Sequence, residues 1–273
     1  MSTKIKFLGI AAFEITLPDG RVVLIDPCLD ANPASPVRAV DSSGSGPSDS
    51  ILRTRRGQSL QRADLVLVTH LAADHMGDAA AIARKFGCPV VCGPEVRYFL
   101  GCQGVNPQQI RTVPWHGQVN PLGIRVRSVP SMHASVGIAP DGQWLAGPPM
   151  GFILYAAEDC RIYHSGDTAI FSDLQLIGQL YQPNVGLLCA CELEQEYLAS
   201  IGLQDHYGNE MSGDEGALAA RWLRLEYAIC CHFLDPDGRP DVEKFVSALA
   251  TAEGPKPIVL RPGQTFSYPP EEV

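Results

Sequence analysis

Residues whose types suit metal binding gather in one short segment of the chain. His70, Asp74 and His75 fall within six positions, in the stretch Thr-His-Leu-Ala-Ala-Asp-His-Met-Gly-Asp that begins at Thr69. Imidazole nitrogens and carboxylate oxygens are ligands of zinc, iron and manganese in proteins. Because the apolar run 65–68 precedes the segment, we expect a turn between a strand and a helix that directs all three side chains toward one ion. A helix cap or a surface position is the alternative for these residues.

Three further candidate ligands follow other predicted strands. His133 comes after the alternating run 124–129, Asp167 follows residues 161–164 in a Gly-Asp-Thr sequence, and His232 follows residues 228–231. Functional groups of α/β folds gather at the ends of strands, so we expect these segments to converge. A simple turn residue is the alternative for Asp167, and a hydrogen-bonded core histidine is the alternative for His133 and for His232.

Two weaker candidates lie between residues 190 and 210. His206 sits in the polar stretch 204–208, and its unperturbed pKa of about 6.5 suits a residue that protonates a leaving group. A surface loop is the alternative for His206. Glu192 begins a series of glutamates that alternate with other residues, so a solvated face is the alternative to a ligand role.

Residues 30–57 form a long polar segment rich in proline, serine and glycine. Loops of this length in compact domains are usually functional or disordered. The segment contains four arginines, and in a functional loop an arginine would bind an anionic substrate. A solvated loop is the alternative. The arginines are Arg38, Arg53, Arg55 and Arg56.

The elements that position these residues alternate between strand and helix. The first third is predicted to hold a hairpin over 4–10 and 12–17 and a return strand over 22–25. A strand over 65–68, a helix over 78–85, a strand over 89–92 and a helix over 94–101 follow in that order. The middle is predicted as strands 124–129, 152–155 and 161–164. The spacing of Ser212 and Glu215 predicts a capping box that opens a helix. A strand over 228–231, a helix over 241–250 and closing strands follow, and the fold class is α/β.

Composition excludes several classes of protein. The 273 residues are 45% hydrophobic and 19% charged, which is the balance of a folded protein and not of a disordered one. The net charge of −9 argues against binding extended nucleic acid. We find neither a transmembrane segment nor a secretory signal, and nine scattered cysteines without a CxxC pair predict unpaired thiols in the cytoplasm. The sequence is compatible with a homo-oligomer.

The order HxxxDH, a histidine after a strand, Gly-Asp-Thr and a late histidine resembles the metallo-β-lactamase superfamily. The sequences Ile25-Asp26-Pro27 and Met211-Ser212 resemble a subgroup of small cytoplasmic metal-dependent hydrolases that includes L-ascorbate 6-phosphate lactonase. The resemblance implies an αββα sandwich formed by one domain over residues 1–273, with the metal site at the edge of the two sheets. It also implies that the long polar loop 30–57 lies near this site.

The ligand sets come from this resemblance. The family motif is HxHxDH, and Ala72 stands where the family has its middle histidine. One metal pocket would be complete, and its ligands would be Asp74, His75, Asp167 and His232. The other would hold only His70, His133 and Asp167, so we expect one tight metal ion and a weak or absent second one. His206, Glu192 or a water would be the alternatives for the missing ligand. Zinc is favoured, and manganese or iron are the alternatives.

The resemblance and the ligand types together imply a hydrolase of a small molecule. A bound divalent ion lowers the pKa of its water to about 7 and polarises the substrate oxygen. Asp74 would orient the water and His206 would protonate the leaving group. Lactones or other carboxylic esters and amides are the expected substrates. A phosphodiesterase acting on a small nucleotide or phosphoester and a non-catalytic metal-binding or ligand-sensing protein are the two alternatives.

Overall fold

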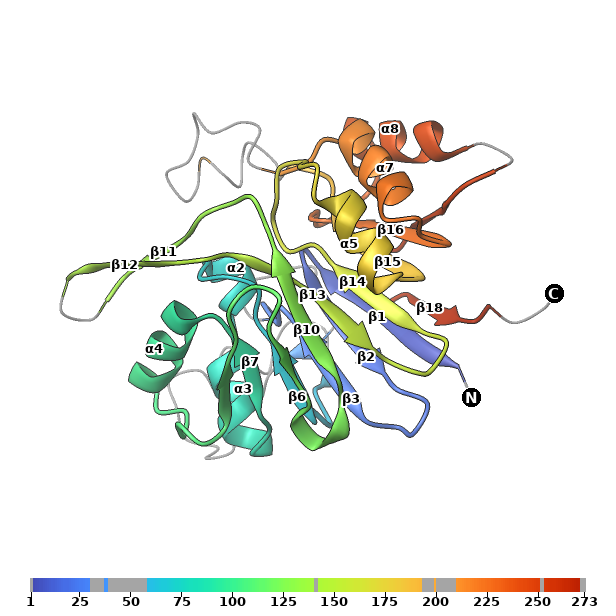
Figure 1. Cartoon of the computed structure of the whole chain (residues 1–273). Coiled ribbons are helices and arrows are strands. Elements are labelled where there is room, and N and C mark those ends of the chain that lie inside the picture. Colours follow the sequence, from blue (N-terminus) through green and yellow to red (C-terminus); the bar gives the residue numbers. More distant parts are fainter. Residues whose placement is uncertain are drawn as a thin grey trace.

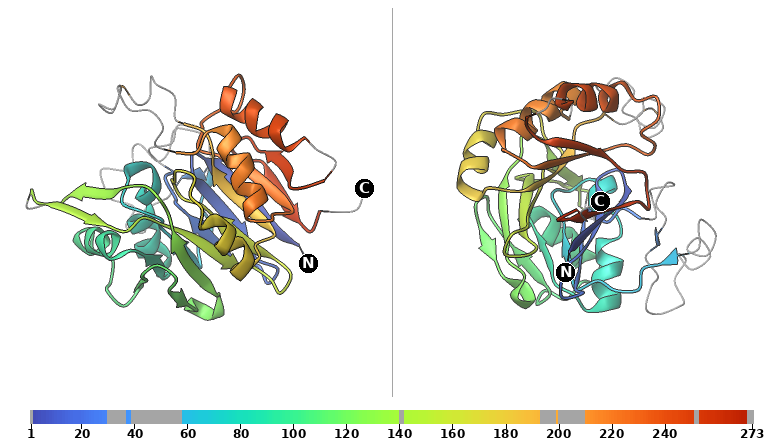
Figure 2. Two further views of the ribbon diagram at one scale, coloured as in Figure 1. Left: turned by 45° about the horizontal axis from the view of Figure 1, so that its top comes forward. Right: turned by 90° about the vertical axis from the view of Figure 1, so that its right-hand side faces the viewer.

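The computed structural model describes residues 2–29, 37–38, 58–139, 142–192, 199, 210–250 and 253–270. Two sheets lie face to face, and helices cover the outer face of each (Figures 1 and 2). The predicted αββα sandwich of the α/β class is therefore confirmed. Apart from Val37 and Arg38, the long polar segment 30–57 falls outside the described residues.

The first sheet has seven strands in the order β18-β1-β2-β3-β6-β7-β8. The predicted N-terminal hairpin and its return strand form its antiparallel part, and β3, β6, β7 and β8 run parallel. Strands β6 and β7 are buried throughout, which explains their uninterrupted apolar sequences. The strands are β1 (Thr3–Gly9), β2 (Ala12–Thr16), β3 (Val22–Ile25), β6 (Leu65–Leu67), β7 (Val90–Cys92), β8 (Ile110–Thr112) and β18 (Thr265–Tyr268).

The second sheet also has seven strands, in the order β17-β16-β15-β14-β13-β10-β9. Strands β14 to β17 are parallel to one another, so their carboxyl ends meet at one edge of the sheet. The strands are β9 (Gln118–Val119), β10 (Val126–Pro130), β13 (Met150–Tyr155), β14 (Arg161–His164), β15 (Val185–Cys189), β16 (Tyr227–Cys231) and β17 (Lys256–Val259).

Helices complete the outer layers. The first sheet is covered by α3 and α4, and the second by α5, α7 and α8 (Figure 2). The helices are α2 (Ala73–Met76), α3 (Ala79–Phe86), α4 (Pro94–Cys102), α5 (Leu174–Tyr181), α7 (Gly213–Trp222) and α8 (Pro240–Leu249), with a 3₁₀ turn over Pro121–Gly123. Among the described residues, no helix combines the length and the apolar character needed to cross a bilayer.

Local sequence explains where these helices begin. Ser212 and Glu215 form the predicted capping box of α7 with both reciprocal hydrogen bonds. Asp78 precedes α3 as expected, but its side chain does not cap the helix. Its carboxylate accepts a hydrogen bond from the Leu29 amide (2.6 Å) instead, because the chain after β3 passes beside this helix end.

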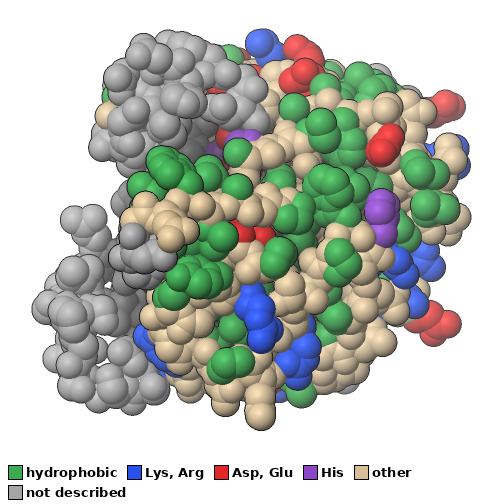
Figure 3. All heavy atoms as spheres, turned by 60° about the vertical axis from the view of Figure 1, so that its left-hand side comes forward, with side chains coloured by type: hydrophobic (Ala, Val, Ile, Leu, Met, Phe, Trp, Pro, Cys, Tyr) green, Lys and Arg blue, Asp and Glu red, His purple; other side chains and the backbone are tan. Residues whose placement is uncertain are grey.

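Two pairs of short strands lie outside the sheets. Strand β4 (Val37–Arg38) pairs with β5 (Gln58–Ser59), and β11 (Ser135–Ile138) forms a hairpin with β12 (Trp144–Gly147). The hairpin extends from the body of the molecule above α4 (Figure 1). Figure 3 views the molecule from the side of the hairpin, and hydrophobic side chains cluster on this face. Val136, Ile138 and Trp144 of the hairpin are exposed.

The core has two parts. One fills the space between the sheets and extends to α5, α7 and α8, and the other lies between the first sheet and helices α3 and α4. All nine cysteines are free, and all but Cys102 are buried. The expectation of unpaired cysteines is confirmed.

Candidate metal centre

The segment after β6 directs His70, Asp74 and His75 toward the space between the two sheets. His70 lies three residues beyond Leu67, where the buried strand ends, and the four-residue helix α2 carries Asp74 and His75. The Ala72 backbone is extended (φ −135°, ψ 152°) at the N-terminal boundary of α2, so the chain turns sharply between His70 and the helix. The turn brings the rings of His70 and His75 to a centroid distance of 4.2 Å.

The second sheet supplies Asp167 from the turn that follows β14. Gly166 has a φ of +57°, and a Cβ there would lie 2.9 Å from the Thr69 Cβ, so glycine permits this close approach of the two sheets. His164 supports the turn: its Nδ1 accepts a hydrogen bond from the Gly166 amide (2.9 Å), and its Nε2 donates to the Ala11 carbonyl (3.0 Å). Both ring nitrogens are therefore used in structural contacts.

His232 follows β16 with a φ of +79°, an uncommon value for a residue with a side chain. Its backbone amide donates to the Ile10 carbonyl (2.8 Å), and its Nδ1 donates to the Cys191 carbonyl (3.0 Å). Strained backbone of this kind clusters at functional sites. Contacts to both sheets fix the ring, and Nε2 is left facing Asp74 and Asp167.

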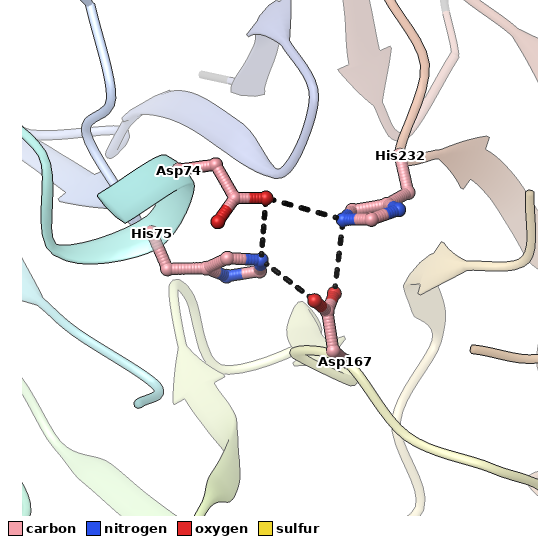
Figure 4. A group of neighbouring side chains, drawn as sticks. All are labelled: Asp74, His75, Asp167 and His232. Atoms are coloured by element: carbon pink, nitrogen blue, oxygen red, sulfur yellow. Dashed lines mark ion pairs between the residues drawn. The ribbon is translucent and has the colours of Figure 1, made fainter. Parts of the chain in front are cut away.

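Four side chains form the first candidate ligand group (Figure 4): Asp74, His75, Asp167 and His232. The His75 Nε2 lies 3.0 Å from Asp167 Oδ2 and 3.8 Å from Asp74 Oδ2. The His232 Nε2 lies 3.3 Å from Asp167 Oδ1 and 3.6 Å from Asp74 Oδ2. One ligand atom from each residue lies within 4.8 Å of all the others, a spacing that suits a shared cation.

A second group consists of His70, His133 and Asp167. The Nε2 atoms of both histidines lie 3.9 Å from Asp167 Oδ2. Asp167 therefore belongs to both groups, and its carboxylate lies between them. This second group has three members among the described residues, one fewer than the first.

Contacts behind the ligands set the histidine tautomers. Asp26, which is fully buried, accepts hydrogen bonds from the His75 Nδ1 and from the hydroxyl of Thr69, both at 2.8 Å. The single Thr69 hydroxyl proton goes to Asp26, so the His70 Nδ1 must donate to that oxygen (3.1 Å). In each case the proton on Nδ1 leaves Nε2 with a lone pair for a metal. Asp26 also has a positive φ of +45°.

The donor atoms fit a cation. The Nε2 atoms of His70, His75 and His232 are buried without a hydrogen-bond partner among the described residues, as is the Asp167 Oδ1. Buried polar atoms are rarely left in this state. These four atoms belong to the two ligand groups, and imidazole with carboxylate is a donor set that zinc, iron and manganese accept.

Charges in the cluster are strongly coupled. Burial lowers the pKa of His75, but the carboxylates of Asp167, Asp26 and Asp74 outweigh burial and hold this pKa well above its ordinary value. For Asp167, burial is outweighed by His232 and His75, and its pKa lies well below the ordinary range. Burial, reinforced by the His75 charge, lowers the pKa of His70 to about 3. Protons on His75 and His232 balance the carboxylates here, and a cation would replace them.

Glu210 is a neighbour of the cluster that sequence reasoning missed. Burial raises its pKa to about 7, with further increases from the Asp167, Glu192 and Asp74 charges and an opposing effect of His232. Its only sequence signal is its position one residue before the buried Met211 that precedes the capping box of α7. Glu192 lies within electrostatic range of Glu210 and belongs to neither ligand group.

The other predicted site residues are distributed differently. His206, Arg53, Arg55 and Arg56 lie outside the described residues, as does the side chain of Arg38. Ala72 is half-buried and lines a cavity of about 460 Å³ together with Ala73, Met76 and Gly77. None of the six candidate ligands lines this cavity, so it lies beside the ligand segment and not at the ligands.

Comparisons with known proteins agree with this arrangement. The family model described as a beta-lactamase superfamily domain matches residues 21–233. A UPF0173 metal-dependent hydrolase of Thermofilum pendens is 33% identical over 97% of this chain and 99% of the relative. Another, from Cupriavidus taiwanensis, is 30% identical over 97% of this chain and 86% of the relative.

A solved structure shows the same architecture. Igni18, a metallo hydrolase from Ignicoccus hospitalis, is 26% identical and superposes with a TM-score of 0.70, covering 98% of this chain and 99% of that protein. The fold, the matched family model and the full-length relatives lead to one assignment. The chain belongs to the beta-lactamase superfamily and, within it, to the UPF0173 metal-dependent hydrolases.

Proposed function

We propose that the protein hydrolyses a small molecule with a divalent cation held by Asp74, His75, Asp167 and His232. The observation that carries this proposal is that His75 Nε2, His232 Nε2 and Asp167 Oδ1 are buried in one cluster and have no hydrogen-bond partner in the described part of the chain. His70 and His133 are proposed as ligands of a weaker second ion that shares Asp167. The beta-lactamase superfamily assignment and the names of the relatives support hydrolysis as the reaction class.

Zinc is the proposed metal, since the four proposed tight ligands are two histidines and two aspartates, and both side-chain types bind zinc in proteins. When bound, such a cation polarises a carbonyl oxygen and lowers the pKa of a water molecule at the site. Manganese and iron remain alternatives, because both accept the same nitrogen and oxygen donors.

The chain's own residues supply orientation and proton handling. Asp26 and the Cys191 carbonyl hold the rings of His75 and His232, so that neither has to reorganise when a ligand binds. The Asp74 side chain remains 17% exposed, the largest value in the first group, and water can reach it. We propose that Asp74 orients the attacking water and that His206 protonates the leaving group.

The proposed substrates are lactones or other carboxylic esters and amides. This finer assignment comes from the sequence resemblance to the subgroup that includes L-ascorbate 6-phosphate lactonase. The same resemblance supports two further proposals, a single domain over residues 1–273 and a position of residues 30–57 near the site. A cytoplasmic location is proposed from the nine free cysteines.

The test measures metal content and turnover on the same preparations. Wild-type protein, His232→Ala and the control His116→Ala are analysed by elemental mass spectrometry, then assayed on panels of lactones, esters, amides and phosphodiesters. His116 is an exposed histidine that contacts Tyr181. We expect wild type and His116→Ala to bind zinc and to hydrolyse carboxylic esters in a chelator-sensitive reaction, whereas His232→Ala does neither.

The other outcomes separate the alternatives. Turnover of phosphodiesters alone would support the phosphodiesterase. A metal-free wild-type protein without turnover on any panel would support a non-catalytic role and contradict the proposal.

A further inference from the structure

A buried carboxyl group is linked through one serine to the segment that carries His70 and Asp74. Glu95, in the first turn of α4, is 2% exposed, and no basic side chain is paired with it among the described residues. The Glu95 Oε2 has no hydrogen-bond partner among the residues that the structure describes. Burial raises the pKa of Glu95, which favours the neutral acid. Burying a carboxyl group that is not fully hydrogen-bonded costs free energy of folding.

Among the described residues, the one side chain that hydrogen-bonds to Glu95 is Ser135, at the start of β11. The Ser135 hydroxyl donates to Glu95 Oε1 (2.6 Å) and accepts a hydrogen bond from the Leu71 amide (2.9 Å). A serine hydroxyl has a single proton. Because that proton is directed at Glu95, a lone pair of the oxygen is directed at Leu71. Glu95 therefore fixes the orientation in which Ser135 receives the Leu71 amide.

Two glycines make room for the carboxyl group. A Cβ built on Gly93 would lie 2.5 Å from Glu95 Oε2, and a Cβ on Gly147 of β12 would overlap the same atom. Neither glycine has the positive φ that would require glycine for backbone reasons. The available space, and not the backbone conformation, accounts for glycine at these positions. The hairpin β11–β12 and α4 thus close around the Glu95 carboxyl.

Leu71 stands between two candidate ligands in the chain. His70 precedes it and Asp74 follows three residues later. On the other side of His70, the Thr69 amide donates to Asp26 Oδ1 (2.8 Å). The backbone on either side of His70 is therefore held by two side-chain acceptors, Asp26 from β3 and Ser135 from β11. Loss of either acceptor would let the ligand segment move.

We propose that Glu95 is a positioning residue of the metal centre, acting through Ser135 on the amide of Leu71. The proposal rests on the metal role assigned to His70 and Asp74 above. Outer contacts of this kind typically change metal affinity 10- to 100-fold when they are removed.

A double-mutant cycle tests the route of this effect. Zinc dissociation constants are measured by chelator competition for wild type, Glu95→Leu, Ser135→Ala and the double variant. Amide hydrogen exchange at Leu71 is measured on the metal-free proteins. We expect each single substitution to weaken zinc binding about 10-fold or more and to speed Leu71 exchange. In the double variant we expect no weakening beyond Ser135→Ala, because both residues act through one hydroxyl.

Two further variants separate positioning from folding. Glu95→Gln keeps a carbonyl oxygen for the Ser135 proton, so we expect zinc binding within about 3-fold of wild type. Ser128→Ala removes another buried serine hydroxyl, which donates to the Pro114 carbonyl (2.5 Å) in a different part of the fold. We expect that control to keep wild-type zinc binding and wild-type exchange at Leu71.

The refuting results are specific. Ser135→Ala with wild-type zinc affinity and wild-type Leu71 exchange overturns the proposal, even if Glu95→Leu fails to fold. Effects on affinity that multiply in the double variant also overturn it. If wild-type protein binds no zinc, the proposed function fails, and Leu71 exchange in the metal-free variants still decides whether Glu95 holds this amide.

Discussion

Replacing Asp26 with asparagine should disable the metal centre without touching a ligand. Asp26 is fully buried and accepts three hydrogen bonds, all at 2.8 Å: from the Thr69 amide, the Thr69 hydroxyl and the His75 Nδ1. Asparagine retains one acceptor oxygen and adds two N–H donors. If the amide nitrogen faces Thr69 N, two buried donors oppose each other. If it faces His75, Nδ1 must lose its proton and accept from the amide, and a neutral His75 ring then carries its one proton on Nε2.

The second arrangement removes the lone pair that would bind the metal. Loss of an outer hydrogen-bond partner usually costs 10- to 100-fold in metal affinity, or about 1.4 to 2.7 kcal/mol. An opposed buried donor costs the folded state a further amount of about 1–3 kcal/mol. We therefore expect a zinc dissociation constant at least about 10-fold higher than that of wild type, together with a lower melting temperature.

Zinc affinity is measured by chelator competition, and the protonation of His75 Nδ1 by long-range ¹H–¹⁵N NMR of the metal-free protein. Asp64→Asn is the matched control, because Asp64 accepts hydrogen bonds from the Val22 amide (2.7 Å) and from Arg62, away from the ligands. Asp26→Asn protein with wild-type zinc affinity and its proton still on His75 Nδ1 would refute the reasoning. A comparable affinity loss in Asp64→Asn would point to general destabilisation instead.

Three further predictions concern the ligands. His75→Ala and His232→Ala should each lose metal and turnover, because each removes a ligand from the four-residue group; near wild-type metal content by elemental analysis would contradict the assignment. Ala72→His should raise the metal-to-protein ratio, and an unchanged ratio would mean that another group already serves the second site. The metal-free protein should lose stability as the pH rises above 6.5. The folded pKa values of His75 and His232 lie well above 6.5, so their contribution is fully present below that pH and is lost as the pH rises through the folded values. The slope is at most about 1.4 kcal/mol per pH unit for each proton, read from thermal melts in chelator; melts that are flat from pH 6.5 to 9 would contradict it.

Strand periodicity made much of the fold predictable. The alternating or uninterrupted apolar runs are local features, and they mark β1, β2, β3, β6, β13, β14 and β16 within a few residues. The hairpin β11–β12 was not predicted. Its strands, Ser-Val-Gly-Ile and Trp-Leu-Ala-Gly, contain glycine and alanine, which disfavour strands in isolation. Packing against α4 and Leu71 decides their conformation.

The candidate ligands could likewise be selected from the sequence. Histidine and aspartate placed just after apolar runs are expected at one edge of an α/β fold, and His70, Asp74, His75, His133, Asp167 and His232 do lie together. The proton-donor role of His206 stays a prediction, since that residue lies outside the described residues.

Only the tertiary structure decided how these side chains work as a group. The position of Asp167 between two ligand groups, the acceptors that set each histidine tautomer, and the connection from Glu95 through Ser135 to Leu71 all join residues far apart in the chain. Sequence periodicity reports which way a side chain faces within its own element. Hydrogen bonds between elements depend on distances of a few ångströms that arise only when the two sheets pack together.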